Sequence, residues 1–388
     1  MSANNHHQRY AHIVGWGKYV PSNILTNDEL AKRVDTSDVW IRERTGIRER
    51  RIATKETTAS MALYAAQDAL EVADVSPNEI DLVIVATSTP EYIFPATASI
   101  VQDQLGAQSA GAFDLSAACS GFVYGLSVGA SMIRAGTYNN VLVIGSETFS
   151  RIINWKDRTT CILFGDGAGA VLLRGSDEFG GVLSSVLGSD GSGGELLEVP
   201  AGGSRNPASI ETVMANLHTV RMNGREVYRF ATRVMVDATK QALQKANIPL
   251  SELDMLVPHQ ANARIIDYAA KALNLPPEKV IKNLDRYGNT SAASIPLALV
   301  EAIEEKRVNP GDHLVFVGFG GGLSWGACAL EWTEPTIKRA TTPQRAAQSR
   351  LRYQWAHVKS FGHRVLRRVD AGVSHTLDRI EGSKNGDE

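Results

Sequence analysis

The sequence of 388 residues contains only three cysteines, Cys119, Cys161 and Cys328, and their spacing fits neither a disulfide framework nor a metal cluster. It also lacks a long apolar run: no segment reaches the length of a membrane span, and the first ten residues are polar rather than signal-like. These absences exclude the disulfide-stapled and membrane-spanning classes. They predict a cytoplasmic protein with reduced thiols and no metal.

The sequence also has no large excess of positive or negative charge, since the formal net charge is only −2. The charges are distributed unevenly along the chain: residues 335–388 carry 11 basic and 5 acidic side chains, whereas the preceding part carries 29 basic and 37 acidic ones. A basic tail therefore follows an acidic body. We expect no nucleic-acid partner for this chain.

What the sequence does contain is a small-residue stretch at 114–126, where a short apolar strand leads into a helix. Cys119 lies where the predicted strand stops and the helix starts, and its neighbours are small enough for a ligand to reach the sulfur. A helix N-terminus favours the thiolate over the thiol, which suits a nucleophile. The alternative is a buried structural cysteine, because free cysteine is among the most buried residue types.

A second stretch, residues 36–51, is unusually rich in arginine and includes one tryptophan. One interpretation is a solvated loop or helix face. The other is a phosphate-binding rim with an aromatic plate, which suits a ligand that carries a nucleotide. The side chains concerned are Trp40, Arg42, Arg44, Arg48, Arg50 and Arg51.

The sequence repeats itself at a constant offset of 173 residues. Residues 69–85 and 242–258 share an Ala-Leu pair, a later Ala and a Glu-apolar-Asp run before a strand, and the strand at 141–145 matches the one at 314–318. Each copy alternates helical patterns with short, nearly continuous apolar strands, which is typical of buried, mostly parallel sheets. The pattern predicts an α/β fold made of two duplicated halves.

The same offset places Cys119 opposite Ala292, inside another small-residue turn that opens a helix. A duplicated fold tends to build its site where the copies meet, so the second half should supply chemistry that faces Cys119. Along the chain we expect a flexible N-terminus at 1–9, a first half with the nucleophile at 10–175, a Gly-rich connecting region at 176–219, a second half at 220–333 and a basic helical tail at 334–388.

Two side chains of the second half are candidates for that chemistry. His259 follows the strand that mirrors residues 80–85, and Asn289 begins the helix that mirrors the cysteine helix. A lone histidine after a strand is more often a hydrogen-bonded structural residue, yet both side chains fall where the mirror copy places its nucleophile. The run from Gly318 to Gly322 offers bare main-chain N–H groups that could serve as oxyanion donors.

Six motifs in a fixed order make the chain resemble the β-ketoacyl-acyl-carrier-protein synthases of type III, within the thiolase superfamily. The resemblance covers the body from about Tyr10 to Trp332 and implies a five-layered αβαβα fold and a homodimer. It implies no cofactor besides the coenzyme A and phosphopantetheine-carrier thioesters of the substrates. The motifs are DTSDVWIRERTGIRERR (35–51), FDLSAACSGF (113–122), FGDGAGAVLL (164–173), VPHQANARI (257–265), GNTSAASIPLAL (288–299) and GFGGGLSWG (318–326).

The resemblance also implies roles for matching positions. It makes Cys119 the nucleophile, with His259 and Asn289 completing the triad, and the backbone N–H groups of Cys119 and Gly321 the oxyanion donors. The other implied roles are an adenine pair (Trp40, Arg158), a contact to the phosphates of coenzyme A (Arg44), the passage of pantetheine (Gly224, Asn262), a limit on the partner subunit's acyl pocket (Phe94) and docking of the acidic carrier protein (Arg229, Arg264, Lys271). Two departures are Met-Asn-Gly-Arg at 222–225, where the better-studied members have a small residue, Gly and Asn, and Arg229 in place of a lysine.

The implied activity is the decarboxylative Claisen condensation of an acyl-coenzyme A primer with malonyl-acyl carrier protein, which gives 3-oxoacyl-acyl carrier protein and initiates fatty acid synthesis. In this scheme His259 and Asn289 donate hydrogen bonds to an enolate, and the carboxylates of the body take no part. The alternative is a related enzyme that builds a specialised ketide or transfers an acyl group in secondary metabolism. A carrier-binding module without turnover is a third class, against which the intact triad argues.

The tail lies outside the resemblance and has its own pattern. From Pro343 to Ile380, apolar residues recur at spacings of three and four, and basic residues occupy the remaining arc. This pattern predicts a basic amphipathic helix. Three alternatives stay open for it: packing on the acidic body, contact with an acidic carrier or partner protein, and contact with an anionic membrane surface.

Overall fold

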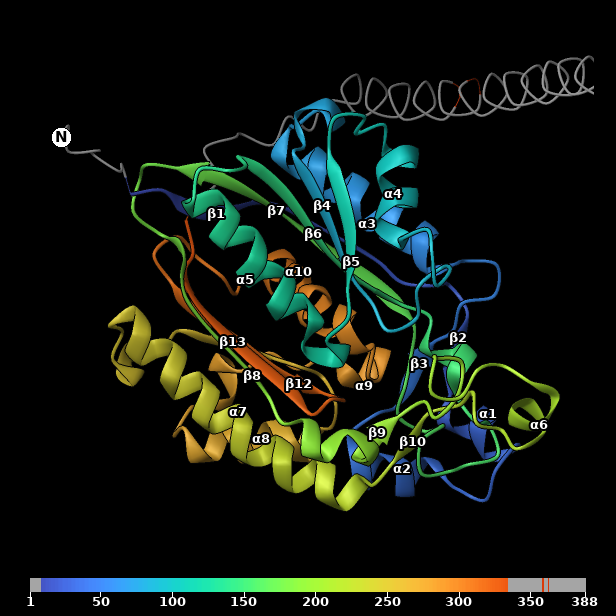
Figure 1. The fold of residues 1–388 in the computed structure, drawn as a ribbon. Helices are drawn as coiled ribbons and strands as arrows, with labels where there is room; N and C mark the ends of the chain where they lie inside the picture. Colours follow the sequence, from blue (N-terminus) through green and yellow to red (C-terminus); the bar gives the residue numbers. More distant parts are fainter. Residues whose placement is uncertain (1–7, 334–357, 359–361, 363–388) are drawn as a thin grey trace, which may run out of the picture.

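The computed structural model describes residues 8–333 together with residues 358 and 362. Its helices and sheets form five layers, with a helical layer between two sheets and a further helical layer on each outer face (Figure 1). This arrangement confirms the predicted αβαβα body made of two similar halves. The predicted tail helix falls outside the described residues apart from the two isolated positions.

The first sheet has the strand order β1–β7–β6–β4–β5. Strand β4 runs parallel to β5 and β6, whereas β7 is antiparallel to both β6 and β1. All residues of β4 and β6 are buried, because helices cover both faces of the sheet. The strands are β1 (Tyr10–Tyr19), β4 (Leu82–Ala86), β5 (Gly111–Leu115), β6 (Asn140–Glu147) and β7 (Gly167–Ser176).

The second sheet, in the order β11–β12–β13–β8, repeats this arrangement. Strand β11 is parallel to β12, and β13 is antiparallel to both β12 and β8. A single parallel bridge between Leu256 and Val280 marks the place that β5 has in the first sheet. The strands are β8 (Gly181–Ser189), β11 (Met255–Pro258), β12 (His313–Gly320) and β13 (Ser324–Glu331).

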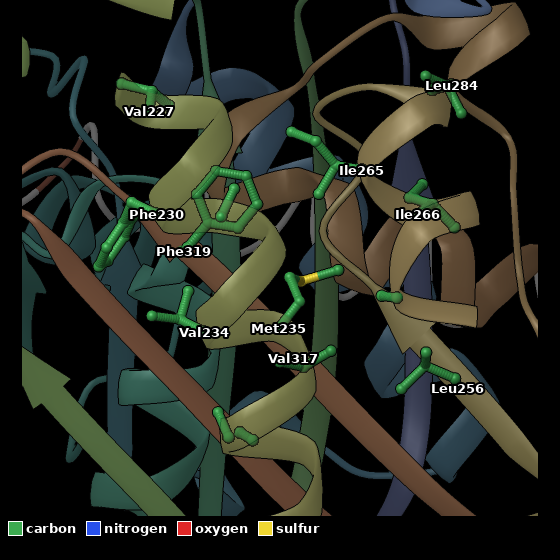
Figure 2. Close-up of a cluster of buried hydrophobic side chains, with 14 of the residues drawn as sticks. Val227, Phe230, Val234, Met235, Leu256, Ile265, Ile266, Leu284, Val317 and Phe319 are labelled. Atoms are coloured by element: carbon green, nitrogen blue, oxygen red, sulfur yellow. The ribbon is translucent and has the colours of Figure 1, made fainter. Parts of the chain in front are cut away.

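The helices fill the three remaining layers (Figure 1). α3 and α4 cover the first sheet, α5 and α10 lie between the sheets, and α7 and α8 cover the second sheet, with a hydrophobic cluster at each of these contacts. Figure 2 shows part of the cluster under α7 and α8, where Phe230 meets Phe319 of β12 edge-on. The helices are α3 (Thr58–Ala73), α4 (Thr97–Leu105), α5 (Gly121–Arg134), α7 (Gly224–Ala246), α8 (Ala263–Ala272) and α10 (Ser294–Glu304).

Local capping signals set the ends of these helices. The side chains of Thr57 and Ser60 form a capping box at the start of α3. α7 begins at an Asn223 side chain that accepts from the Glu226 N–H, and it ends at Asn247 in a left-handed conformation, which asparagine tolerates well. The first turn of α7 is thereby fixed beside the pocket described below.

Several matched elements around the centre of the two halves are 173 residues apart, as the sequence predicts. β6 matches β12, and α5 and α10 start at Gly121 and Ser294. One-turn 3₁₀ helices precede them, which we name the Cys119 turn (Ala118–Ser120) and the Ala292 turn (Ser291–Ala293). Each turn packs against the central strand of the other half, the Cys119 turn on β12 and the Ala292 turn on β6.

Smaller elements gather at the end of the sheets where both turns lie (Figure 1). Two short antiparallel pairs, β2 with β3 and β9 with β10, form part of this region. The short elements are β2 (Ile24–Thr26), α1 (Asn27–Ala31), α2 (Asp38–Thr45), β3 (Glu49–Arg51), β9 (Leu197–Glu198), α6 (Ile210–Met214), β10 (Arg221–Met222) and α9 (Leu284–Tyr287).

Three further features bear on the class of protein. The cysteines Cys119, Cys161 and Cys328 are all free and buried. Among the described residues there is no group of three or more His, Cys, Asp or Glu side chains that could hold a metal ion. None of the helices in that same part of the chain combines the length and apolarity that a membrane span needs.

Candidate active site

The Cys119 turn places the predicted nucleophile at the start of α5, where the side chain is only 3% exposed. Ala118, just before it, has a φ of +46°, a left-handed conformation that costs a non-glycine residue about 1–2 kcal/mol. The Ser120 hydroxyl donates to the Ala117 carbonyl at 2.7 Å and lies 2.9 Å from the hydroxyl of Ser324 on β13. These contacts hold the strained turn against the second sheet.

Gly320, the last residue of β12, closes on this turn. A Cβ at Gly320 would lie 2.6 Å from the main-chain nitrogen of Cys119, so only glycine fits here. This close approach of Gly320 to the Cys119 nitrogen explains why one position of the glycine-rich run at 318–322 must be glycine. Gly320 lines the pocket around Cys119, whereas the next residue, Gly321, does not. The oxyanion role of the Gly321 N–H stays a prediction.

His259 enters the same space from the end of β11. Its main-chain N–H donates to the Val317 carbonyl at 2.8 Å, and its ring meets Phe319 edge-on with 5.3 Å between the centroids. The side chain is 1% exposed, and neither ring nitrogen has a hydrogen-bond partner among the described residues. Burial lowers the pKa of His259 to about 3, so the imidazole is neutral at pH 7 and one ring nitrogen carries a hydrogen.

Asn289 is clamped through its backbone to the first half. Its N–H donates to the Leu163 carbonyl at 2.8 Å, and its carbonyl accepts from the Gly165 N–H at 3.0 Å. The side-chain Oδ1 accepts from the Ser291 N–H at 2.8 Å. Because the amide oxygen is engaged in this way, the amide NH₂ is the group that Asn289 can offer to a ligand.

The three predicted catalytic residues line one pocket together with Gly224 and Asn262. Burial raises the pKa of Cys119 to about 12, and a hydrogen bond with Ser291 acts in the opposite direction. Burial of the sulfur therefore opposes the predicted preference for the thiolate in the resting protein. The apolar part of the wall comes from both halves: Leu163, Phe164, Leu197, Met222, Val227, Tyr228, Ala261, Ile265 and Phe319.

The predicted coenzyme A residues form a second group beside this pocket. The guanidinium groups of Arg158 and Arg44 lie over the Trp40 ring, 5.1 and 5.5 Å from its centroid. The Asn262 side-chain NH₂ donates to the Arg44 carbonyl at 3.1 Å, and Asn262 also lines the pocket. The structure therefore brings Trp40, Arg44 and Arg158 together and links them to the Cys119 pocket through Asn262.

The other predicted site residues lie outside the pocket. Phe94 is 84% exposed on the loop between β4 and α4. Arg229 on α7 and Arg264 and Lys271 on α8 are exposed cations on two helices that pack together. Arg229 pairs with Glu226 at 2.9 Å, and the Arg264 guanidinium lies 5.6 Å from the centre of the Tyr228 ring. Their roles stay predictions.

Sequence reasoning set aside a carboxylate that the structure places beside the catalytic residues. Glu147, fully buried at the end of β6, accepts from the Thr89 hydroxyl at 2.6 Å and from the Ser291 hydroxyl at 2.9 Å. Ser291 has a left-handed φ of +49°, like Ala118. The signal that could have found both was the repeat, which sets Glu147 opposite Gly320 and Ser291 opposite Ala118.

Two family models match the chain, and their ranges contain the three predicted catalytic residues. The model for 3-oxoacyl-[acyl-carrier-protein (ACP)] synthase III matches residues 113–191, which include Cys119. The model for the C-terminal part of 3-oxoacyl-[acyl-carrier-protein (ACP)] synthase III matches residues 243–332, which include His259 and Asn289.

The chain is also similar to whole proteins. A β-ketoacyl-[acyl-carrier-protein] synthase III of Desulfitobacterium hafniense is 55% identical over 323 residues, which are 83% of this chain and 98% of that protein. The crystal structure of 3-oxoacyl-[acyl-carrier-protein] synthase III from Aquifex aeolicus matches with a TM-score of 0.78 at 48% identity, over 83% of this chain and 100% of that one. The priming β-ketosynthase from the R1128 polyketide biosynthetic pathway matches with a TM-score of 0.79 at 37% identity, over 84% of this chain and 98% of that one.

Proposed function

Because this chain belongs to the β-ketoacyl-acyl-carrier-protein synthase III family, we propose that it joins an acyl-coenzyme A primer to malonyl-acyl carrier protein and so initiates fatty acid synthesis. The observation that carries the proposal is one apolar pocket lined by Cys119, His259 and Asn289. His259 offers a ring N–H with no partner among the described residues, and Asn289 offers its NH₂ group. These are the donors that a developing enolate needs.

In the first step the Cys119 sulfur attacks the thioester carbonyl of the acyl-coenzyme A. A new S–C bond forms, the bond to the coenzyme A sulfur breaks, and the thiol proton ends on coenzyme A, which leaves as a thiol. The resting thiol of Cys119 loses its proton during the attack rather than before it, since burial raises its pKa to about 12.

In the second step malonyl carrier protein loses carbon dioxide. The electron pair of the broken C–C bond moves to the thioester, and negative charge gathers on its oxygen. His259 and Asn289 donate hydrogen bonds to that oxygen. A neutral imidazole suits this role because it donates without having to lose a proton, and the pKa of His259, lowered to about 3 by burial, keeps it neutral.

In the last step the enolate carbon attacks the acyl carbonyl on Cys119. The oxyanion that forms is held by the main-chain N–H groups of Cys119 and Gly321. It collapses to the new carbonyl as the C–S bond breaks, and the Cys119 thiolate that leaves takes a proton from water. The scheme uses side chains, main-chain donors and the two thioesters, and no step is assigned to a metal or a further cofactor. A cytoplasmic location is part of the same proposal.

The remaining predicted residues supply recognition. Trp40 and Arg158 would hold the adenine and Arg44 the phosphates of coenzyme A, with Gly224 and Asn262 along the pantetheine path. The carrier protein would dock on the exposed cations Arg229, Arg264 and Lys271, since an acidic partner is attracted to such a surface.

We extend the proposal to a homodimer. Tyr92, Ile93 and Phe94 form a run of exposed apolar side chains, 58%, 88% and 84% exposed, and a second subunit would cover them. Contact of the tail with a membrane surface stays one of its three predicted alternatives.

The test of the function is a pair of assays on the purified full-length chain. Incubation with acyl-coenzyme A should add one acyl mass on Cys119, as peptide mapping would show. Malonyl carrier protein should then release carbon dioxide and yield the condensed product. Acyl label on Cys161 or Cys328 with none on Cys119 would overturn the mechanism, and no acylation at all would favour a carrier-binding module.

A specialised ketosynthase is the second candidate, and the similarity to the priming β-ketosynthase of the R1128 pathway favours it. The triad is the same in both cases. A panel of acyl-coenzyme A primers, offered with the carrier protein of fatty acid synthesis, separates the two. Acyl-Cys119 that forms but is never elongated on this carrier would favour the specialised role.

A further inference from the structure

Glu147 is a buried carboxylate held by neutral donors. Besides the Thr89 and Ser291 hydroxyls, it accepts from the Ser88 N–H at 3.1 Å and from the N–H of Ala292. The side chain is 0% exposed. Burying a carboxylate among neutral groups is unfavourable unless its hydrogen bonds are well made. A buried carboxylate at position 147 therefore indicates a specific role.

The repeat suggests the reason. Glu147 ends β6 as Gly320 ends β12, and Ala292 corresponds to Cys119. In one half Gly320 reaches the Cys119 nitrogen with no side chain, and in the other half Glu147 brings a carboxylate oxygen to the Ala292 N–H. A negatively charged oxygen therefore occupies the counterpart of the place where the reaction would develop its oxyanion at Cys119.

The carboxylate is connected to the catalytic residues through Ser291. The Ser291 hydroxyl donates to Glu147, and the Ser291 N–H donates to Oδ1 of Asn289 at 2.8 Å. The same hydroxyl is within hydrogen-bonding reach of the Cys119 thiol. Ser291 has a left-handed φ of +49°, which an isolated serine does not favour, so its backbone needs outside support. The Ala292 and Ser291 bonds to Glu147 supply that support.

We propose that Glu147 is a positioning residue: its carboxylate fills the second half's counterpart of the oxyanion site, fixes Ser291, and so holds Asn289 with its NH₂ directed to the enolate. The inference rests on the proposed function, because it assigns Asn289 to the decarboxylation step. Glu147 itself touches no substrate. Its loss should therefore affect the step that Asn289 serves.

Ionisation of Glu147 gives this role a pH dependence. Burial raises the pKa of Glu147 to about 6, and the donors around it act in the opposite direction. Below that pH the carboxyl gains a proton and loses acceptor capacity, so decarboxylation should fall as the pH drops through about 6. The groups that face Glu147 are the hydroxyls of Thr87, Thr89 and Ser291, two main-chain N–H groups and the Cys119 thiol.

The experiment compares Glu147→Gln with the wild-type full chain in two assays. Decarboxylation of malonyl carrier protein should fall by about tenfold to a hundredfold, by analogy with the loss that follows when a residue orienting a metal ligand is removed. The acid limb near pH 6 should disappear. Acylation of Cys119 by acyl-coenzyme A should not fall, because removing the nearby negative charge favours the Cys119 thiolate. The matched control is Asp81→Asn. It removes a carboxylate that accepts two N–H groups at 2.8 Å at the other end of the same sheet, so decarboxylation and its pH profile should be unchanged.

A double-mutant cycle with Asn289→Ala decides whether Glu147 acts through Asn289. Glu147→Gln should add little to the loss already caused by Asn289→Ala, because the two changes remove one function. Independent, multiplying losses would overturn the inference, as would wild-type decarboxylation in Glu147→Gln. A wild type that does not decarboxylate malonyl carrier protein would overturn the proposed function instead.

A second variant covers the case in which Glu147→Gln does not fold. Ser291→Ala keeps the carboxylate and the Ser291 N–H and removes only the hydroxyl between them. It should lower decarboxylation in the same direction by a smaller factor and show the same lack of additivity with Asn289→Ala. A fully active Ser291→Ala protein would contradict the proposal on its own.

Discussion

The Cys119 turn and the Ala292 turn have similar backbones, and each packs against the central strand of the other half. Each has a left-handed residue at its first position, Ala118 or Ser291, and each opens a helix between the sheets. They differ in what the opposite central strand brings to them: Gly320 brings no side chain, and Glu147 brings a carboxylate. In the proposed mechanism the duplicated framework therefore has one place where the reaction develops its oxyanion, and its counterpart is filled by the Glu147 carboxylate.

Moving the nucleophile between the turns should have the largest effect. Cys119→Ala should abolish acylation and condensation, and adding Ala292→Cys should not restore them, because Glu147 already occupies the N–H of residue 292. Intact-mass spectrometry after incubation with acyl-coenzyme A checks this. The Cys119→Ala chain should still release some carbon dioxide from malonyl carrier protein. An acyl group on the thiol introduced by Ala292→Cys would show that the two turns are chemically equivalent after all.

Removing a donor of the second half should separate the half-reactions. His259→Ala or Asn289→Ala should lower decarboxylation by about two to four powers of ten, while self-acylation at Cys119 persists. Since burial lowers the pKa of His259 to about 3, its neutral form is present throughout the range above that pH, and its titration should not limit the rate near pH 6.5. Carbon dioxide release by the donor variants checks the first point. The second is checked by carbon dioxide release from pH 5 to 8 in Glu147→Gln, which lacks the acid limb expected from the Glu147 carboxylate. Wild-type decarboxylation by His259→Ala would remove histidine from the assigned role.

Giving Gly320 a side chain should make the first turn resemble the second. Gly320→Ala would bring a Cβ within 2.6 Å of the Cys119 nitrogen, where no flexible atom can yield. Displacing a reacting group by a fraction of an ångström to 1 Å can cost up to about a hundredfold, so acylation of Cys119 should slow by that order. The matched control is Gly191→Ala, where a Cβ meets nothing within 4 Å. Equal acylation rates in the two variants would mean that the Cys119 turn can shift to accommodate the added Cβ without loss of reactivity.

The coenzyme A group should give the smallest effect, because it lies on the surface. Arg44→Ala removes one of two guanidinium groups over Trp40, an exposed contact worth about 0.5–1 kcal/mol. The KM for acyl-coenzyme A should rise a few-fold and the KM for malonyl carrier protein should change less, because its phosphopantetheine carries no adenine. Steady-state kinetics with each substrate varied in turn checks this. Parallel rises in both constants would point to a folding role.

Much of the fold could be predicted from the sequence, because strands buried on both faces leave apolar runs and a duplication leaves a constant offset. The convergence of Cys119, His259 and Asn289 followed from the same offset. The high pKa of the Cys119 thiol could not be predicted, since it depends on how completely other segments bury the sulfur. Glu147 was missed for a similar reason: its partners come from residues 87–89 and 291–292, which only the folded chain brings together.

Because each turn packs against the central strand of the other half, a substitution in one half can disturb a turn that belongs to the other half. A Cβ at Gly145, in the first half, would lie 2.2 Å from the Ala292 carbonyl oxygen and disturb the Ala292 turn, which lies beside the proposed enolate donor Asn289. A Cβ at Gly320, in the second half, would disturb the nucleophile. If the two halves were produced as separate chains, the substituted glycine would lie on one chain and the disturbed turn on the other. The effect of either substitution on the reaction would therefore be seen only after the two chains had assembled.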